Sequence, residues 1–303
     1  MALFLGLDCG GTTTRSRIED ENGEVVFEGK AGSANLASTP ESEIKRNLEA
    51  ALQGAPQADY AFGGFAGLLT SSDRHRAISI LEAVTGIGAI DAQPDFHAAI
   101  AAEPESVGIV ISGTGSKVAS RTRAGIVKSG GGGLYLGDLG SAADIGRRAI
   151  HATILSACRE EASSEFWRTL ADLFGTEEPD QIVAAVYRSL TPAARLAQIA
   201  PSVVYDADRG KRYARHCVES ALGDLADEVW CHARLHHSHM EVLKLSVTGG
   251  LWEIKPEMLE YFIAIVEKRK PEVESNRLPK IELTKLEVAP VIGAVSLARE
   301  LQS

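Results

Sequence analysis

The sequence has few of the features that mark secreted, membrane or nucleic-acid-binding proteins. No apolar run approaches the roughly 20 residues that span a bilayer, and only four of the 303 residues are cysteines, with no CxxC pair among them. Scattered cysteines are typical of a reducing compartment, and Met1–Phe4 offers no basic leader, so we expect a cytoplasmic protein. Lys and Arg number 31 against 41 Asp and Glu, a net charge of −10. Without a local basic cluster, this charge argues against nucleic acid or an anionic membrane as partner.

Two common nucleotide-binding signatures are also missing. There is no GxxxxGK[ST] loop, and no complete GxGxxG follows a predicted strand. The glycine run Gly130–Gly133 comes closest but lacks the spacing. If this chain binds a phosphate, the backbone donors must come from another kind of turn.

What the chain does have is an average globular composition, with 45% hydrophobic and 24% charged residues, and enough length for two lobes. Apolar runs and turn residues predict strands, and 3.6-residue periodicity predicts helices. The predicted strands are 3–8, 12–18, 25–28, 60–65, 107–112, 116–121, 242–248 and 282–288. The predicted helices are 41–52, 73–84, 96–102, 147–158, 164–174, 181–190, 193–204, 209–237, 256–268 and 290–301.

Three predicted strands end in glycine-rich tips, at residues 8–14, 112–116 and 247–250. Glycine permits the positive φ angles and close approaches that aim several backbone N–H groups at one phosphate, and Thr or Ser hydroxyls add donors. A single tip is better explained as a tight hairpin, but three of matching character favour phosphate binding. The first two tips lie about one hundred residues apart and suggest two related lobes. Asp8, at the end of the first strand, is placed to hold Mg²⁺.

These motifs resemble the phosphate and adenosine motifs of the acetate and sugar kinase/Hsp70/actin superfamily. Two further segments, 32–36 and 130–141, resemble the N-acetylglucosamine kinase branch, which is grouped with BadF/BadG-type ATPases. The resemblance runs in order from residue 3 to residue 294. It implies an α/β fold of two ribonuclease-H-like, actin-like lobes with an interlobe cleft. We expect residues 1–106 with the closing helix 290–303 in one lobe, and residues 107–289 in a larger, helix-rich lobe.

The resemblance also implies the cofactors and the reaction. MgATP is expected in the cleft, and its γ-phosphate is transferred to a hydroxyl of an amino sugar such as N-acetylglucosamine or glucosamine. The resemblance further implies that the protein is a homodimer and that its substrate is a small sugar. The residues expected to bind ATP are Asp8, Gly10, Gly11, Thr12, Thr13, Gly113, Thr114, Gly115, Gly249 and Gly250, with Asp8 also at the metal.

Phosphoryl transfer to a hydroxyl needs a carboxylate to accept the proton. Asp95 follows Pro94 at the start of the predicted helix 96–102. The residues alone favour a helix N-cap for Asp95, whereas the resemblance implies that Asp95 is the general base.

For the acceptor, the resemblance implies a binding site formed by Asn35, Asp95, Thr114, Gly131, Asp138 and Ala142. Three positions depart from the family pattern: Gly132 replaces an aromatic residue, Leu139 an acid, and Lys117 an asparagine. The sugar and the phosphorylated position therefore stay open. Two other functions remain: an ATPase that couples hydrolysis to a partner protein, and a catalytically silent sugar sensor.

Two further features suggest chemistry. His232, His236 and His239 invite a metal interpretation, but a solvated helix end is favoured. Cys9 lies inside the first glycine tip, so we hypothesise that a thiol reagent blocks ATP binding there.

Overall fold

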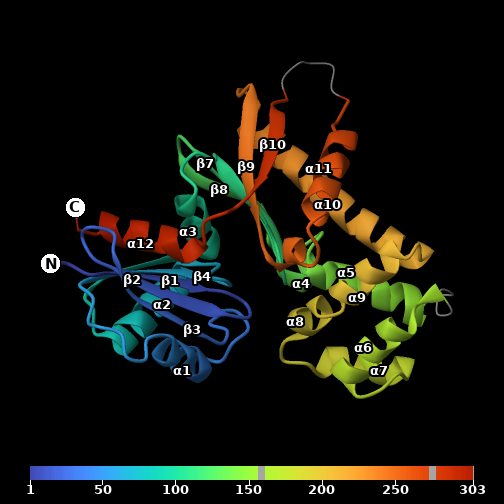
Figure 1. Ribbon diagram of the computed structural model, residues 1–303, viewed down its shortest axis with the longest axis horizontal. Coiled ribbons are helices and arrows are strands. Elements are labelled where there is room, and N and C mark those ends of the chain that lie inside the picture. The colour runs from blue at the N-terminus through green and yellow to red at the C-terminus, as the bar shows by residue number, and fades with distance from the viewer. Residues whose placement is uncertain (156–160, 273–277, 303) are drawn as a thin grey trace. The chain divides into compact units, whose positions relative to one another are not determined.

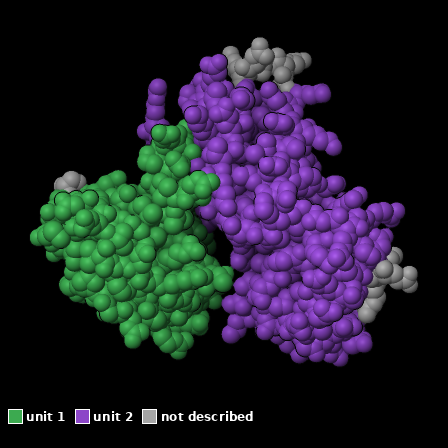
Figure 2. Space-filling view, viewed as in Figure 1, with its two compact units in different colours: residues 1–107, 286–303 green, residues 108–285 purple. Residues whose placement is uncertain are grey.

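The computed structural model describes residues 1–155, 161–272 and 278–302, and it divides into two compact units. Unit 1 contains Met1–Val107 and Leu286–Ser303, and unit 2 contains Gly108–Lys285 (Figure 2). Each unit is built on a five-stranded mixed sheet, so the predicted α/β class is confirmed. The domain boundaries expected from the sequence, at 106/107 and 289/290, stay a prediction.

The sheet of unit 1 has the order β3-β2-β1-β4-β5. β1 pairs antiparallel with β2 and β2 with β3, while β1, β4 and β5 run parallel. The strands are β1 (Phe4–Cys9), β2 (Thr14–Glu19), β3 (Val25–Ala31), β4 (Tyr60–Phe65) and β5 (Ala89–Pro94). Because the three parallel strands end at one edge, residues that follow them are brought close together.

Helices cover both faces of this sheet. α1 (Glu41–Ala51) and α2 (Ser71–Thr85) share one apolar core with the sheet. α3 (Asp95–Ala102) and α12 (Pro290–Glu300) pack side by side on a second core (Figure 1). The last helix of the chain therefore completes the unit that the first strand begins.

The sheet of unit 2 has the order β10-β9-β6-β7-β8. β6 pairs antiparallel with β7 and β7 with β8, while β6, β9 and β10 run parallel. The strands are β6 (Gly108–Ser112), β7 (Ser116–Thr122), β8 (Gly125–Gly130), β9 (Val242–Thr248) and β10 (Lys280–Lys285). Strand order and directions match those of unit 1, so the predicted repeat is confirmed at the level of sheet topology.

Most helices of unit 2 lie between β8 and β9 in the chain (Figure 1). They are α4 (Gly133–Leu136), α5 (Ala142–Ile150), the π-helical segment η1 (His151–Leu155), α6 (Ser164–Phe174), α7 (Pro179–Arg188), α8 (Pro192–Ala197), α9 (Ala200–Asp208) and α10 (Arg212–His236). The 3₁₀ segment η3 (Gly250–Glu253) and α11 (Met258–Lys268) follow β9.

Several elements differ from the prediction. β5 and β8 were not expected, because neither has a clear apolar alternation, and each forms by pairing with an established neighbour. The predicted helix 193–204 is two helices in the structure, α8 and α9. Pro201 is the second residue of α9, and proline is favoured in the first turn of a helix. The predicted helix 147–158 begins earlier, at Ala142, and its residues 156–158 lie outside the described residues. None of the described helices is both long and apolar enough to cross a membrane.

Candidate active site

The first glycine tip joins β1 to β2 in unit 1. The N–H of Gly10 donates to the carbonyl of Thr13 at 3.0 Å and closes the turn. A Cβ on Gly10 would lie 2.9 Å from that same oxygen, so a larger residue would push the turn open. Thr12 is exposed at the tip, while Thr14 is buried with a hydroxyl that has no partner. The tip is thus a tight turn with exposed donors, as phosphate binding requires.

Asp8 lies one residue before the end of β1, opposite Arg15 on β2. Burial and, to a lesser extent, the nearby charge of Asp95 raise the pKa of the Asp8 carboxyl to about 6, against the opposing effect of Arg15. Two neighbouring carboxylates, one of them poorly solvated, favour the binding of a cation, because the cation compensates their negative charge.

Asp95 is the first residue of α3 and directly follows β5. Since β1, β4 and β5 are parallel neighbours, Asp8 and Asp95 flank the end of β4. At Gly64 of β4 a Cβ would lie 3.5 Å from the Asp95 Cα, so the small residue admits the helix start. The N-cap position is Pro94, and the Asp95 Oδ1 accepts the N–H of Phe96 at 3.0 Å. The N-cap role favoured from the residues alone is therefore wrong.

Asn35 lies beside the first tip. Its Oδ1 accepts the N–H groups of Ala37 and Ser38, at 2.8 and 3.2 Å, and so serves a local turn. Its Nδ2 lies 3.7 Å from where a Cβ on Gly11 would be. The amide nitrogen is therefore the part of Asn35 directed at the tip.

Cys9 does not fit the hypothesis of a reactive thiol. Its side chain is fully buried, and burial, with the charge of Asp8, raises its thiol pKa well above the ordinary value. A protonated, inaccessible thiol does not react with alkylating reagents, so that hypothesis is corrected.

The second and third tips meet in unit 2. Gly249, with φ 118°, lies so close to Ser112 that a Cβ would be 2.2 Å from the Ser112 carbonyl oxygen. A Cβ on Gly113 would in turn lie 3.4 Å from the nitrogen of Gly250. The N–H of Gly113 donates to the carbonyl of Gly115 at 2.9 Å, so the turn closes around Thr114. Two motifs about 135 residues apart thus form one glycine-lined surface, by the parallel pairing of β6 with β9.

The turn that carries Asp138 packs against the second tip. A Cβ on Gly115 would lie 2.5 Å from an Asp138 carboxylate oxygen. Asp138 has φ 53°, and no other described residue besides glycine has a positive φ. A cavity of about 180 Å³ opens beside it, lined among others by Lys117, Leu139 and Glu228. Strained backbone of this kind is common at functional sites.

The predicted site residues therefore form two groups, one within each unit. The unit 1 group is Asp8, Gly10, Gly11, Thr12, Thr13, Asn35 and Asp95. The unit 2 group is Gly113, Thr114, Gly115, Gly131, Asp138, Ala142, Gly249 and Gly250.

Sequence reasoning missed Arg15, Asp144 and Arg148. Arg15 is paired with Asp8 across the hairpin, which the predicted strands 3–8 and 12–18 could have indicated. Asp144 stands three residues after Ser141 and bonds its hydroxyl, the spacing of a helix N-terminus. The four-residue spacing between Asp144 and Arg148 is a local signal that was missed, whereas the other partners of Arg148, Ser220 and Asp224, lie far away in the sequence.

The histidine cluster is a solvated helix end only in part, because His239 is exposed and His236 partly exposed, whereas His232 is buried. His232 and His237 are buried, and each ring donates to or accepts from the hydroxyl of Ser120 through Nε2, at 2.7 and 2.6 Å. Among the described residues, no group of three or more His, Cys, Asp or Glu side chains could hold a metal ion. The preferred interpretation of a solvated helix end is therefore wrong for His232 and agrees with the structure for His239.

Mg²⁺ fits the acidic edge of unit 1 in its donor chemistry. Magnesium in nucleotide-binding sites keeps several waters and takes one or two carboxylates besides the phosphates, so a set of three protein ligands is not needed. Asp8 and Asp95 offer such carboxylates, and the raised pKa of Asp8 shows that uncompensated negative charge is unfavourable there.

Two sheets of equal topology, each with a glycine hairpin between its first two strands, define an α/β protein of the actin-like ATPase class. A family model for the BadF/BadG/BcrA/BcrD ATPase family matches residues 5–298, and the chain belongs to this family. The family implies ATP as the nucleotide.

Known relatives are sugar kinases by name. A Clostridium acetobutylicum protein named N-acetylmuramic acid/N-acetylglucosamine kinase is 24% identical over 310 residues, covering 99% of each chain. Glucosamine kinase GspK of Vibrio cholerae is 29% identical over 171 residues, 52% of this chain and 56% of that protein. The structure of a candidate N-acetylglucosamine kinase from Porphyromonas gingivalis matches with a TM-score of 0.74 and 21% identity, covering 100% of both chains. These relatives are phosphotransferases that use ATP.

Proposed function

We propose that this protein is an ATP-dependent kinase that transfers the γ-phosphate of MgATP to a hydroxyl of an amino sugar. The observation that carries the proposal is that Asp8 and Asp95 lie near one another at the edge of the sheet where β1, β4 and β5 end. A phosphotransferase with a hydroxyl acceptor needs one acid near the metal and one near the acceptor. Membership of an ATPase family and the names of the relatives support the same reaction.

In this proposal the glycine tips bind the nucleotide. The turn 9–14 of unit 1 and the surface formed by Gly113–Gly115 with Gly249 and Gly250 in unit 2 supply backbone N–H groups. Asp8 would hold Mg²⁺, which when bound neutralises the charge that develops on the phosphates.

Asp95 is the proposed general base. It begins α3, and the N–H of Phe96 orients one of its oxygens. An ionised Asp95 accepts the proton of the acceptor hydroxyl as the bond to phosphorus forms.

The proposed acceptor-binding residue of unit 1 besides Asp95 is Asn35, and those of unit 2 are Thr114, Gly131, Asp138 and Ala142. The cavity beside Asp138 carries Lys117 and Glu228 as well, so it offers hydrogen-bond partners of both signs. Amino sugars combine hydroxyls with an amine or acetamide, which suits such a lining.

The test is an ADP-release assay coupled to detection of sugar phosphate. The acceptors are glucosamine, N-acetylglucosamine, N-acetylmuramic acid and glucose. We expect ADP and sugar phosphate in equal amounts with at least one amino sugar. ADP release that no sugar changes would select an ATPase that acts on a partner, and sugar binding without product would select a sensor.

The base is tested by Asp95→Asn. We expect kcat to fall by roughly 10²–10⁴-fold, because the amide cannot accept the proton, while calorimetry finds MgADP affinity within a few-fold. Glu105→Gln, on an exposed acid just past α3, is the control and should match the wild type. Near-normal turnover of Asp95→Asn would remove Asp95 from the mechanism.

A further inference from the structure

The turn 137–141, which carries Asp138, is bonded to the second glycine tip from both sides. The hydroxyl of Ser112 donates to the carbonyl of Gly140 at 2.8 Å, and that of Ser116 donates to Leu139 at 2.6 Å. The N–H of Ala142 donates to the carbonyl of Gly113 at 2.8 Å. A displacement of this turn, hereafter the Asp138 turn, would therefore displace the tip as well.

The backbone of the Asp138 turn is strained and needs external support. The φ of 53° at Asp138 lies in the left-handed region, which costs about 1–2 kcal/mol for most residues with a Cβ and less for Asp, whose short polar side chain can bond locally. Such conformations persist only where surrounding contacts enforce them. Packing supplies some of that support, since a Cβ on Gly140 would lie 2.5 Å from the Leu225 Cβ of α10.

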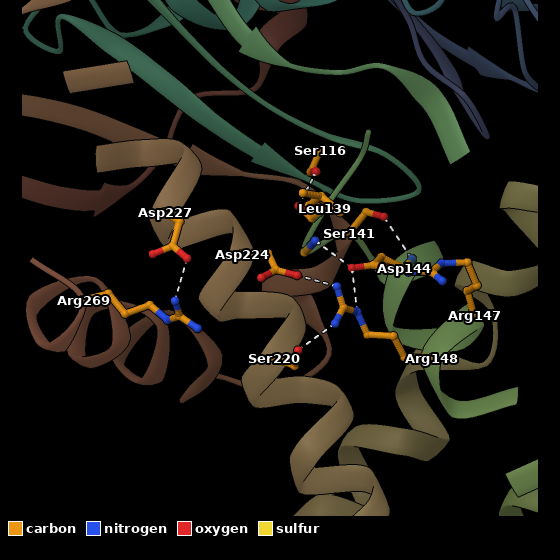
Figure 3. Close-up of polar contacts among 11 residues, drawn as sticks. Ser116, Leu139, Ser141, Asp144, Arg147, Arg148, Ser220, Asp224, Asp227 and Arg269 are labelled. Atoms are coloured by element: carbon orange, nitrogen blue, oxygen red, sulfur yellow. Dashed lines mark hydrogen bonds and ion pairs between the residues drawn. The ribbon is translucent and has the colours of Figure 1, made fainter. Parts of the chain in front are cut away.

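Asp144 supplies further support from inside the protein. Its side chain is 5% exposed, and its Oδ2 accepts the N–H of Gly140 at 3.1 Å. The same Oδ2 accepts from Arg148 Nε at 2.9 Å, and Ser141 Oγ accepts the Asp144 N–H at 3.1 Å (Figure 3). One buried carboxylate thus bonds both the Asp138 turn and a cation.

Arg148 connects this carboxylate to α10. Its Nη1 donates to Ser220 Oγ at 2.7 Å and its Nη2 to Asp224 Oδ2 at 2.5 Å (Figure 3). The planar guanidinium fork thereby holds three partners at once, which a lysine cannot do. Arg147 differs, because it bonds only the other oxygen of Asp144 and its side chain is 50% exposed.

We propose that Asp144 and Arg148 are positioning residues that anchor the Asp138 turn and the Gly113–Gly115 tip to α10. Because Asp138 lies over Gly115, the anchor sets the distance between the acceptor contact and the nucleotide phosphates. Loss of the anchor leaves each binding element present but misaligned. A misalignment near 1 Å is enough to lower transfer about 10²-fold. This inference rests on the proposed kinase function for its catalytic consequence.

The kinetic test compares Arg148→Met with two controls. Arg147→Met removes a cation from the same carboxylate without reaching α10. Arg269→Met breaks an ion pair with Asp227, which lies farther along α10 (Figure 3). For Arg148→Met we expect kcat/KM for the sugar to fall tenfold or more, with KM for ATP within threefold. The ratio of ADP to sugar phosphate should rise above one. Both controls should stay near the wild type.

Arg148→Lys separates positioning from charge. It keeps the positive charge beside Asp144 and should unfold at nearly the wild-type temperature, yet show the raised ADP ratio of Arg148→Met. A ratio of one in both Arg148 variants would overturn the proposal, because a purely stabilising role leaves coupling intact.

Hydrogen exchange tests the anchor without any activity. In the unliganded protein, the Gly140 N–H should be protected in the wild type and in Arg147→Met, and exchange at least tenfold faster in Arg148→Met. If no sugar is phosphorylated but this difference is found, the proposed function fails while the anchor stands. Equal protection in all three proteins would refute the anchor itself.

Discussion

At the scale of single residues, the chemistry of this protein depends on how far individual carboxylates are buried and compensated by cations. Asp144 is a buried carboxylate with two arginines as partners, whereas Asp8 is partly exposed and faces the charge of Asp95 and a single arginine across the hairpin. Burial without full compensation raises the pKa of Asp8 to about 6. Asp144 is therefore suited to a structural role, whereas Asp8 is suited to binding a cation.

The raised pKa of Asp8 predicts a pH-dependent requirement for magnesium. Below about pH 6 the Asp8 carboxyl is mostly protonated, so Mg²⁺ must displace a proton to bind. Above about pH 6 the carboxyl is mostly ionised, and Mg²⁺ binds without displacing a proton. We expect calorimetry to find MgADP affinity about tenfold weaker at pH 5 than at pH 7.5, with proton release on binding. In Asp8→Asn the Mg²⁺ dependence and the pH step should both vanish. Equal wild-type affinities at the two pH values would contradict this.

At the scale of elements, the C-terminal end of α10 is held to β7 and β8 by a buried polar chain. Ser120 on β7 lies between the Nε2 atoms of His232 and His237, and Ser129 on β8 bonds His232 Nδ1 at 2.8 Å. One hydroxyl can donate to one ring and accept from the other, so this arrangement satisfies both rings in their neutral forms. Burial, together with the neighbouring His236 and His237, lowers the pKa of His232 to about 4.

This chain predicts a loss of stability in mild acid. Because the folded pKa of His232 is below its ordinary value of 6.5, the unfolded chain binds the proton first as the pH falls. Stability should therefore be complete above pH 6.5 and decline toward pH 4, by about 3 kcal/mol at most. Urea unfolding between pH 4.5 and 7.5 measures it.

His232→Gln should flatten that pH dependence even if it destabilises the protein at pH 7.5. His239→Gln, on an exposed residue outside the polar chain, is the matched control and should keep the wild-type slope. The same slope in all three proteins would show that the buried rings do not control acid stability.

At the scale of the whole molecule, the two ends of the chain together build unit 1. α12 packs on α3 and β1, and the contact is so close that a Cβ on Gly293 would lie 2.0 Å from the carbonyl oxygen of Ala98. A Cβ on Gly6 of β1 would likewise lie 2.5 Å from the nitrogen of Val295. Both glycines are needed for close approach between elements from opposite ends of the sequence.

Gly293→Ala should therefore destabilise unit 1 by about 1–3 kcal/mol, because the methyl group must push two helices apart. The tryptophans, Trp167, Trp230 and Trp252, all lie in unit 2, so their fluorescence reports on that unit alone. In urea, we expect circular dichroism of the variant to change before tryptophan fluorescence does.

Gly88→Ala is the control for this substitution, since no atom lies within 4 Å of the Cβ it would add. It should unfold like the wild type. Coincident transitions of Gly293→Ala in both signals would show that the two units unfold as one.

Much of the fold could be predicted, because local patterns encode it. β4 and β9 have the predicted bounds, since each is an apolar run ended by glycine or polar residues. The glycine tips were visible for the same reason. β5 contains the polar residues Asp91 and Gln93 and shows no clear apolar alternation. It is a strand because it pairs with the edge of β4.

The candidate site divides in the same way. By itself, the sequence determined most of the strands, the glycine turns and most of the residues that carry chemistry, because backbone preferences and hydrophobic period act over a few neighbouring residues. Only the tertiary structure decided that Asp8 faces Asp95 and that Arg148 meets Asp224, 76 residues away. Such contacts depend on which faces of distant elements bury one another, a choice made by packing of the whole core.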